Sequence, residues 1–244
     1  AAWSRVRDYR LYQLQQMGNV EIFLGSEISV DVACEFEPDH IFVATGSSWR
    51  NDGLGRSRYS AIPGFEGTVL TPDDILDGRE VDGPVIVYDD DHYYMGNVIA
   101  EHLAARGLEV CLVCPLPSIA GWMGYTLEQP RVLTAMVDAG VRMYPNTTAV
   151  AWGGSKLTVK RSDTHEPLPS IEAKTLISVT ARSPSVRLAD ALRLAGLSCS
   201  LIGDALAPGI IQSAVFSGHR VAREYLGTEP KDGIFKREAP TLFI

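Results

Sequence analysis

A chain of 244 residues is long enough to bury a sizeable hydrophobic core, in one large domain or two small ones. With 45% apolar and 21% charged residues, its composition is ordinary for a soluble globular protein. The net charge of −8, without any basic run, argues against a nucleic-acid partner, and no apolar stretch approaches a membrane span. No signal-peptide pattern opens the sequence, so we expect a cytoplasmic protein that binds neither nucleic acid nor membrane.

The amino-terminal part of the chain leads to a strand that ends in a glycine turn. Residues 1–17 indicate a polar lead-in and a helix. Val20–Leu24 is predicted to be a strand, and Ile28–Val32 is predicted to pair near it. The next apolar strand runs into Thr45-Gly46, where small side chains let another backbone or a ligand come close.

A long loop and a short helix follow. Residues 47–67 show no pattern of regular structure, which is unusual for so long a segment in a compact domain. We expect this loop to wrap a surface or a partner. Trp49 and Arg50 could be docking anchors, but packing on their own domain is favoured. Thr71 then caps a helix that ends at Gly78.

The chain is organised around residues 84–115, which read as strand, sharp turn, helix and strand. Val85–Tyr88 is a buried strand, and Glu109–Cys114 is the second. Gly107 ends the helix between them. The apolar face of that helix is predicted to consist of Met95, Val98, Ile99 and Leu103. This βαβ unit has the size of a dinucleotide-binding half.

The cysteines indicate neither a disulfide framework nor an iron–sulfur cluster. Four are too few and too scattered for either. Cys111 and Cys114 form a C-x-x-C, but their odd spacing within a strand points the two thiols to opposite faces. We therefore favour buried core thiols over a redox pair.

The turn of the βαβ unit departs from a working dinucleotide site. Such a site needs G-x-G-x-x-G, for the tight turn, the approach of the pyrophosphate and helix packing. With Gly96 as the third glycine, Asp91 and Tyr93 occupy the first two positions. A carboxylate at roughly 5 Å from a phosphate charge costs about 3 kcal/mol at an effective dielectric constant of about 20, and Tyr93 would fill the phosphate's space. Cys114 and Pro115 stand where the ribose-binding acid is expected.

Two interpretations of this turn stay open from spacing alone. It is either a nucleotide-binding architecture that no longer binds a nucleotide here, or an ordinary βαβ unit with an acidic loop. His92 beside the acids at 89–91 could bind a metal, but a solvated acidic loop is favoured, and we assign no metal site. No His, Cys or Ser has a partner that indicates a catalytic dyad, so we assign no catalytic residue.

The segments that follow are predicted from periodicity and turn residues. A helix closed by Gly140 leads to a strand at 141–144, and its apolar face consists of Val132, Leu133, Met136 and Val137. Antiparallel strands are expected at 147–152, 156–161 and 171–180, with a surface loop at 167–169. A short helix covers 188–195.

The last unit places an acid after a strand. The strand at 200–202 ends in Gly203-Asp204, and a long helix begins near Ile210. Open α/β sheets bind ligands at such a point, so Asp204 could accept hydrogen bonds from a ribose or ribityl hydroxyl, although a helix-capping acid is slightly favoured. The strands at 41–44 and 200–202 look like parts of one sheet with a self-contained unit between them. The sequence therefore predicts an α/β fold in which one nucleotide-binding-type domain interrupts another.

Six stretches together resemble one known family, that of trimethylamine dehydrogenase with the dimethylamine and histamine dehydrogenases. More distantly they resemble the 2,4-dienoyl-CoA reductases. The stretches are D-H-I-F-V-A-T-G-S-S-W-R-N-D-G at 39–53, I-P-G at 62–64, T-P-D-D-I-L-D-G at 71–78, V-I-V-Y-D-D-D-H-Y-Y-M-G at 85–96, T-L-E-Q-P at 126–130 and L-I-G-D-A-L-A-P-G-I-I-Q-S-A-V-F-S-G-H-R-V-A-R-E at 201–224. The resemblance covers nearly the whole chain in order.

The resemblance implies FAD/NAD(P)-binding-type, Rossmann-like domains of three-layer ββα architecture. The outer domain would comprise residues 1–72 and 182–244, without its first βαβ unit, and the inner domain residues 73–181, with the degenerate glycine motif. In the family, an amino-terminal β/α barrel carries FMN and a 4Fe-4S cluster and oxidises the amine. The outer domain holds ADP or FAD, and the inner domain takes NADPH in the reductases and is empty in the amine dehydrogenases.

The family's nucleotide contacts carry over to two pairs of residues. By resemblance, Thr45 and Gly46 approach the nucleotide of the outer domain from one strand, and Gly203 and Asp204 approach it from another. The glycine-rich fingerprint is not in this sequence, so we expect ADP or FAD to bind this chain weakly or not at all. Ala181 stands where the family usually has a glycine, which weakens any carry-over at that turn.

Three functions follow as hypotheses. The first is a carboxy-terminal fragment or subunit of an iron–sulfur flavoprotein amine dehydrogenase, which relies on a barrel domain or subunit as its partner and is expected to form a homo-oligomer. The second is the NAD(P)H-binding part of a reductase, which the substitutions Asp91 and Tyr93 disfavour. The third is a non-catalytic docking module that uses the loop at 47–67.

Overall fold

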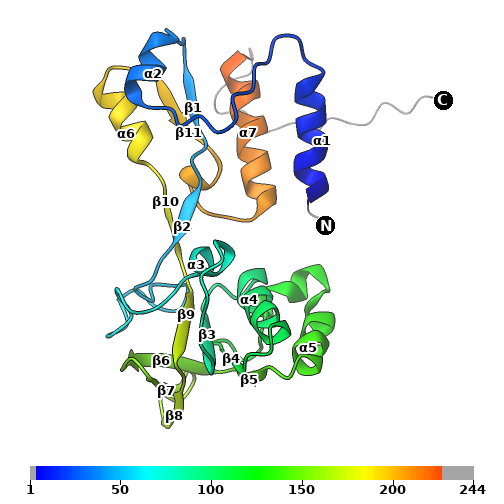
Figure 1. Cartoon of the computed structure of the whole chain (residues 1–244), viewed down its shortest axis with the longest axis vertical. Coiled ribbons are helices and arrows are strands. Elements are labelled where there is room, and N and C mark those ends of the chain that lie inside the picture. Colours follow the sequence, from blue (N-terminus) through cyan, green and yellow to red (C-terminus); the bar gives the residue numbers. More distant parts are fainter. Residues whose placement is uncertain (1–3, 227–244) are drawn as a thin grey trace, which may run out of the picture. The chain divides into compact units, whose positions relative to one another are not determined.

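The computed structural model describes residues 4–226 (Figure 1). This part of the chain divides into two compact units: residues up to 41 together with 188–200, and residues 42–187 together with those from 201 onward. Among the described helices, none combines the length and the apolar character needed to cross a lipid bilayer.

The first unit contains helices α1 (Ser4–Gln15) and α2 (Val30–Glu35) and most of α6 (Arg187–Leu194). The strand expected at residues 20–24 is wrong, because this segment has no regular structure. The expected pairing of residues 28–32 is also wrong, because α2 begins there. The hydroxyl of Ser29 accepts a hydrogen bond from the N–H of Val32 at 3.3 Å. This helix cap outweighs the β-propensity of the branched residues around it.

Strands β1 (Ile41–Val43) and β11 (Cys199–Leu201) form a two-stranded sheet, so the two segments are neighbours as the sequence predicts. In the first unit, the N–H of Ile41 donates to the carbonyl of Ser198 at 2.9 Å. In the second unit, the N–H of Ile202 donates to the carbonyl of Val43 at 3.0 Å.

The second unit is built on a parallel sheet with the strand order β5-β4-β3-β9. Its strands are β3 (Val85–Asp89), β4 (Val110–Val113), β5 (Arg142–Tyr144) and β9 (Thr175–Val179). All residues of β3 and β4 are buried, as apolar runs covered on both faces must be. Helix α4 (Tyr94–Ala105) connects β3 to β4 in the predicted βαβ unit.

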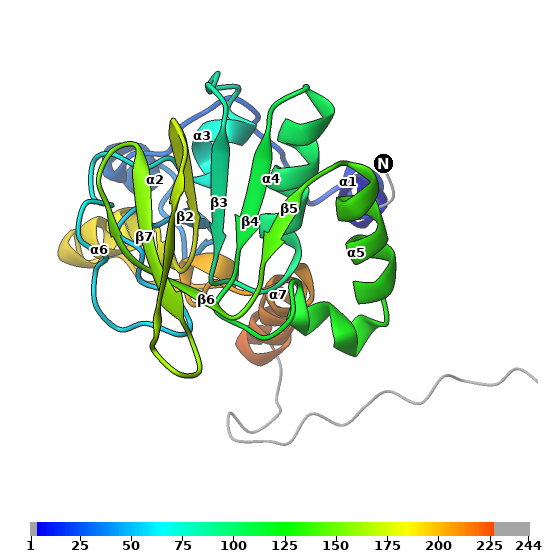
Figure 2. The same cartoon turned by 90° about the horizontal axis from the view of Figure 1, so that it is seen from below.

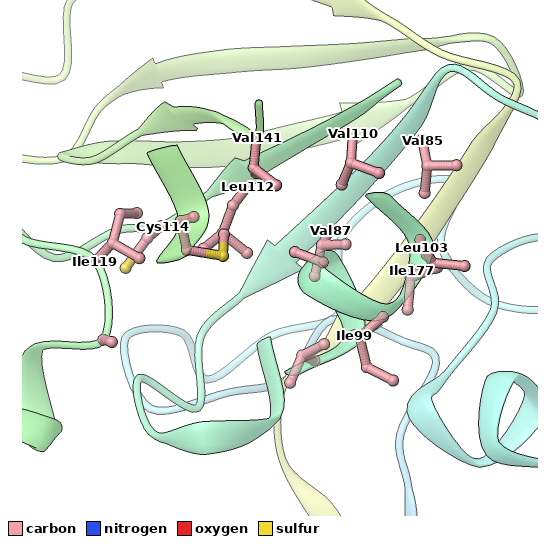
Figure 3. Close-up of a cluster of buried hydrophobic side chains, with 14 of the residues drawn as sticks. Val85, Val87, Ile99, Leu103, Val110, Leu112, Cys114, Ile119, Val141 and Ile177 are labelled. Atoms are coloured by element: carbon pink, nitrogen blue, oxygen red, sulfur yellow. The ribbon is translucent and has the colours of Figure 1, made fainter. Parts of the chain in front are cut away.

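Helices cover one face of this sheet. Side chains of α4, α5 (Gln129–Asp138) and the sheet form one buried hydrophobic cluster, in which Val87, Ile99 and Leu103 are fully buried (Figure 3). The predicted helix faces are wrong at one position each, because Val98 and Val137 are exposed. In α4 the buried stripe instead includes the small residue Gly96, which packs against the end of β3.

A second, antiparallel sheet covers the other face of the parallel sheet (Figure 2). Its order is β6-β7-β8, with β6 (Thr147–Trp152), β7 (Lys156–Arg161) and β8 (Pro167–Glu172). The surface loop expected at 167–169 is wrong, because these residues belong to β8. That strand lies at the sheet edge, where proline removes no ladder hydrogen bond. The antiparallel strand expected at 171–180 is also wrong, because β9 pairs parallel to β3.

Six further elements belong to the described part of the second unit. Strand β2 (Ser47–Trp49) pairs antiparallel with β10 (Arg182–Pro184). Helix α3 (Pro72–Leu76) starts with a capping box between Thr71 and Asp74. The 3-10 helices are η1 (Gly121–Thr126) and η2 (Gly203–Ala205), and helix α7 (Ile211–Leu226) follows η2.

Candidate functional site

The candidate site is the turn between β3 and α4, at the carboxyl end of a central parallel strand. Parallel α/β sheets bind their ligands at this edge. Asp89, Asp90 and His92 are buried here, and Asp91 is half-buried. The expectation of a solvated acidic loop is therefore wrong, and a different segment of the chain covers the turn.

The Asp89 side chain accepts hydrogen bonds from amide groups of the turn. One carboxylate oxygen accepts hydrogen bonds from the N–H groups of Asp91, at 3.1 Å, and of His92, at 2.9 Å. The other oxygen is buried without a hydrogen-bond partner. Burial raises the pKa of Asp89 to about 7, although the amide of His92 opposes the shift. The amides that would face an incoming phosphate are already paired with the side chain of the protein's own Asp89.

Gly96 is needed beside this carboxyl group. A Cβ added at Gly96 would lie 2.5 Å from the Asp89 carboxylate. The glycine that the dinucleotide pattern reserves for helix packing therefore makes room for an acidic side chain. Tyr93 precedes the helix as its N-cap residue without donating or accepting a capping hydrogen bond. Its ring is half-buried and lies edge-on to the ring of Tyr94, with centroids 4.3 Å apart.

Asp90 holds a segment of the long loop, residues 54–58, which we call the capping loop. The backbone N–H of Ser57 donates to the Asp90 carboxylate at 3.1 Å, and the Ser57 hydroxyl donates at 2.7 Å. A Cβ added at Gly55 would lie 2.1 Å from the same carboxylate. The capping loop is therefore in direct contact with the fully buried acid.

Arg56 of the capping loop reaches the third acid. Its guanidinium donates to the carbonyl of Asp91 at 3.0 Å and to the Asp91 carboxylate at 3.3 Å. The same guanidinium lies 4.8 Å from the ring centre of Trp122 in η1. All three acids of the turn thus have partners within the chain.

The rest of the long loop also packs on its own unit. The Trp49 side chain is half-buried against the helix-side cluster, and the backbone N–H of Trp49 donates to the Asp73 carboxylate at 2.8 Å. Arg50 forms an ion pair with Asp52. The loop therefore wraps a surface, as expected, and both candidate docking anchors are engaged inside the chain.

The Cys111 and Cys114 thiols lie on opposite faces of the sheet, as the odd spacing predicts. Cys111 belongs to the cluster beneath β6–β8. Cys114 belongs to the helix-side cluster (Figure 3). Burial raises the pKa of the Cys111 thiol to about 11 and also raises that of Cys114. The Cys114 sulfur lies 3.5 Å from Nδ1 of His92, a contact between residues 22 apart that no local pattern signals. Within residues 4–226, no group of three or more His, Cys, Asp and Glu side chains is placed to hold a metal ion.

The second candidate group lies at the ends of β1 and β11. Thr45 donates its hydroxyl proton to the carbonyl of Ser185 at 2.5 Å. Gly46 has a φ of +75° and Gly203 a φ of +58°, which residues with a Cβ rarely adopt. The N–H of Gly203 donates to the Ser217 hydroxyl at 3.0 Å. A residue with a Cβ would therefore have a strained backbone at either of these two positions.

Asp204 ties the two strand ends together. One carboxylate oxygen accepts hydrogen bonds from Ser47, at 3.2 Å, and from the guanidinium of Arg182, at 2.7 Å. The other accepts one from the N–H of Gly209 at 3.1 Å. Because Ser47 follows Gly46, the four residues singled out by the sequence lie in one neighbourhood. Sequence reasoning missed Arg182, since no motif marks it.

Comparison with known proteins shows which sequences and structures this chain is similar to. The family described as OYE-like second alpha/beta domain matches residues 70–159. The dimethylamine dehydrogenase of Hyphomicrobium sp. (strain x) is 28% identical over 97% of this chain and 37% of its own length.

Two solved structures are also similar. Histamine dehydrogenase from Rhizobium sp. 4-9 is 36% identical, with a TM-score of 0.90 over 97% of this chain and 38% of its own. The 6-hydroxypseudooxynicotine amine oxidase HisD from Pseudomonas geniculata N1 is 38% identical, with a TM-score of 0.88 over 92% and 34%. This chain thus spans just over a third of the length of these relatives. These similarities support the resemblance to the trimethylamine dehydrogenase-like family that the motifs indicate.

Proposed function

We propose that this chain is the nucleotide-binding-type region of a flavin-dependent amine dehydrogenase whose amine oxidation takes place in a β/α barrel outside this chain. The similarity over nearly the whole chain to a dimethylamine dehydrogenase, a histamine dehydrogenase and an amine oxidase carries this proposal. All three names describe oxidation of an amine. FMN and a 4Fe-4S cluster would belong to the barrel, and this chain would supply no catalytic residue.

We also propose that residues 73–181 form an inner domain nested in an outer domain of residues 1–72 and 182–244. The pairing of β2 with β10 supports these boundaries, because the chain enters and leaves the inner segment along two adjacent strands. The three layers of helices, parallel sheet and antiparallel sheet support a ββα architecture for the inner domain.

The inner turn would not bind NAD(P)H. Its two amides are paired with Asp89, and the capping loop contacts Asp90 and Asp91. A phosphate at this position would displace that loop and meet carboxylates, at a cost of about 3 kcal/mol for each charge at about 5 Å and an effective dielectric constant of about 20. This observation favours the amine dehydrogenase over a reductase that takes electrons from NADPH.

The outer site would hold ADP or FAD in the assembled protein, with Thr45, Gly46, Gly203 and Asp204 at the nucleotide. A carboxylate offers about four acceptor sites, and Asp204 already uses three of them for protein donors. The acid therefore has little capacity left for a ribose hydroxyl. This supports weak ADP binding by the chain on its own.

Two measurements test the proposed function. The protein with the complete reading frame should reduce a redox dye when dimethylamine or histamine is added, and not when NADPH is added. Dye reduction driven by NADPH alone, without any response to amines, would instead establish the reductase. For the chain of residues 1–244, calorimetry should detect no micromolar binding of ADP.

A further inference from the structure

Asp90, His92 and Cys114 form a line of hydrogen-bonding groups that the proposed function does not use. Nε2 of His92 lies 2.9 Å from the Asp90 carboxylate, and its Nδ1 lies 3.5 Å from the sulfur of Cys114. All three side chains are buried, with His92 only 2% exposed and the other two fully covered. Aspartate, histidine and thiol in this order are the arrangement of a base-assisted nucleophile.

The neighbours of Asp90 fix the direction of these hydrogen bonds. Its carboxylate already accepts the N–H and the hydroxyl proton of Ser57, and it can only accept from His92 as well. Nε2 of His92 therefore carries a proton. In the neutral ring, Nδ1 is then free to accept the S–H proton of Cys114. The histidine is oriented to act as a base toward this thiol.

Three features mark the line as a covered site and not as ordinary core. His92 adopts a left-handed backbone with a φ of +65°, which is uncommon for residues other than glycine. The capping loop covers Asp90, and the N–H of Trp122 donates to the His92 carbonyl at 3.1 Å. Trp122 also lines an open pocket of about 280 Å³, with Leu116, Pro117, Ser118, Gly121 and Tyr125 as its other walls.

We propose that Cys114, His92 and Asp90 form a masked thiol site that adds small, uncharged α,β-unsaturated carbonyl compounds when the capping loop opens. The aromatic and apolar pocket beside Trp122 suits the body of such a compound. The carboxylates of Asp90 and Asp91 disfavour an anionic reagent. In the closed fold, burial raises the pKa of the Cys114 thiol. The capping loop would act on this thiol through Asp90 and His92, because Ser57 contacts Asp90.

The reaction is an addition that needs no oxidant and releases no leaving group. The sulfur electron pair forms a bond to the β carbon, and the electron pair of the carbon–carbon double bond moves to the α carbon. The thiol proton passes through Nδ1 of His92 to that α carbon. Atoms and charges are thereby conserved in the thioether product.

The experiment uses the full chain, N-ethylmaleimide as the probe and mass spectrometry to follow the labelling rate of each cysteine. Cys111 is the internal reference, because it is almost as deeply buried as Cys114. It lies in β4, the strand that ends just before Cys114, with its thiol on the other face of the sheet. In the Ser57→Ala variant, Cys114 should be labelled at least about tenfold faster than in the unchanged chain, since one hydrogen bond to a charged group is lost. Cys111 should keep its rate.

The role of His92 is tested in the Ser57→Ala background. His92→Asn should slow the labelling of Cys114 about 100-fold, the usual effect of losing a general base. Asparagine tolerates the left-handed backbone, and His165→Asn, at the exposed residue with a φ of +62°, is the matched control. The ratio of the Cys114 rate to the Cys111 rate cancels any general loss of stability. Equal rates at both thiols, or no slowing by His92→Asn, would overturn the proposal.

Discussion

Ionisation of Asp89 should make the free energy of unfolding depend on pH. The substitution Asp89→Asn should remove this contribution. The carboxyl group is buried between the turn and Gly96, with one oxygen unpaired, and its pKa is raised to about 7 from an ordinary value of 3.8. Asparagine has nearly the same shape, keeps an oxygen that can accept the two backbone N–H groups, and cannot ionise.

The sign follows from proton binding in the two states. Between pH 4 and 7 the folded state holds a proton on Asp89 that the unfolded state has released. Raising the pH through this window therefore lowers the free energy of unfolding, and above pH 7 the loss stays constant. A difference of about three pKa units between the folded and unfolded states lowers the free energy of unfolding by up to about 4 kcal/mol.

Urea unfolding at a series of pH values between 4 and 8 measures this effect for both proteins. The unchanged chain should lose stability relative to Asp89→Asn as the pH rises from 4 to 7, and the difference should then level off. The exposed carboxylate of Asp138 in α5 supplies the control, because Asp138→Asn should leave the shape of the curve unchanged. Curves for Asp89→Asn and the unchanged chain that stay parallel across this range would refute the role given to Asp89.

Two further tests of the local structure use urea unfolding, each with a control substitution. Gly96→Ala should destabilise the fold by about 1–3 kcal/mol, because the added Cβ meets the Asp89 carboxylate, and a gain in stability would contradict this packing. Gly218→Ala in α7, where an added Cβ meets no atom within 4 Å, should be neutral or stabilise by up to about 1 kcal/mol. Thr71→Ala should cost about 1 kcal/mol by removing the capping box of α3, and Thr71→Ser should restore most of that stability.

The central βαβ unit was predictable because its signals are local. The apolar run at 85–88 and Gly107 place β3, α4 and β4 within one or two residues of their observed bounds. Short elements were not predictable in the same way. Helix α2 depends on the cap by Ser29, and β8 depends on an edge position that makes its prolines harmless.

The chemistry of the turn depended on contacts that no local pattern shows. Asp91 and Tyr93 were recognisable as departures from a glycine motif in which Gly96 is kept. The sequence did not show that the capping loop, more than 30 residues earlier in the chain, covers the acids and buries them. For the same reason the line from Asp90 through His92 to Cys114 escaped notice, since it joins a turn to the end of another strand.

Calorimetric titration of the full chain with NADPH tests the central claim most directly. The amides of the turn are paired with Asp89, so we predict no binding heat at NADPH concentrations up to about 1 mM. A dissociation constant of about 1 mM corresponds to a binding free energy of about −4 kcal/mol. Micromolar binding, together with density for the cofactor's phosphates over residues 91–96 in a soaked crystal, would contradict the account.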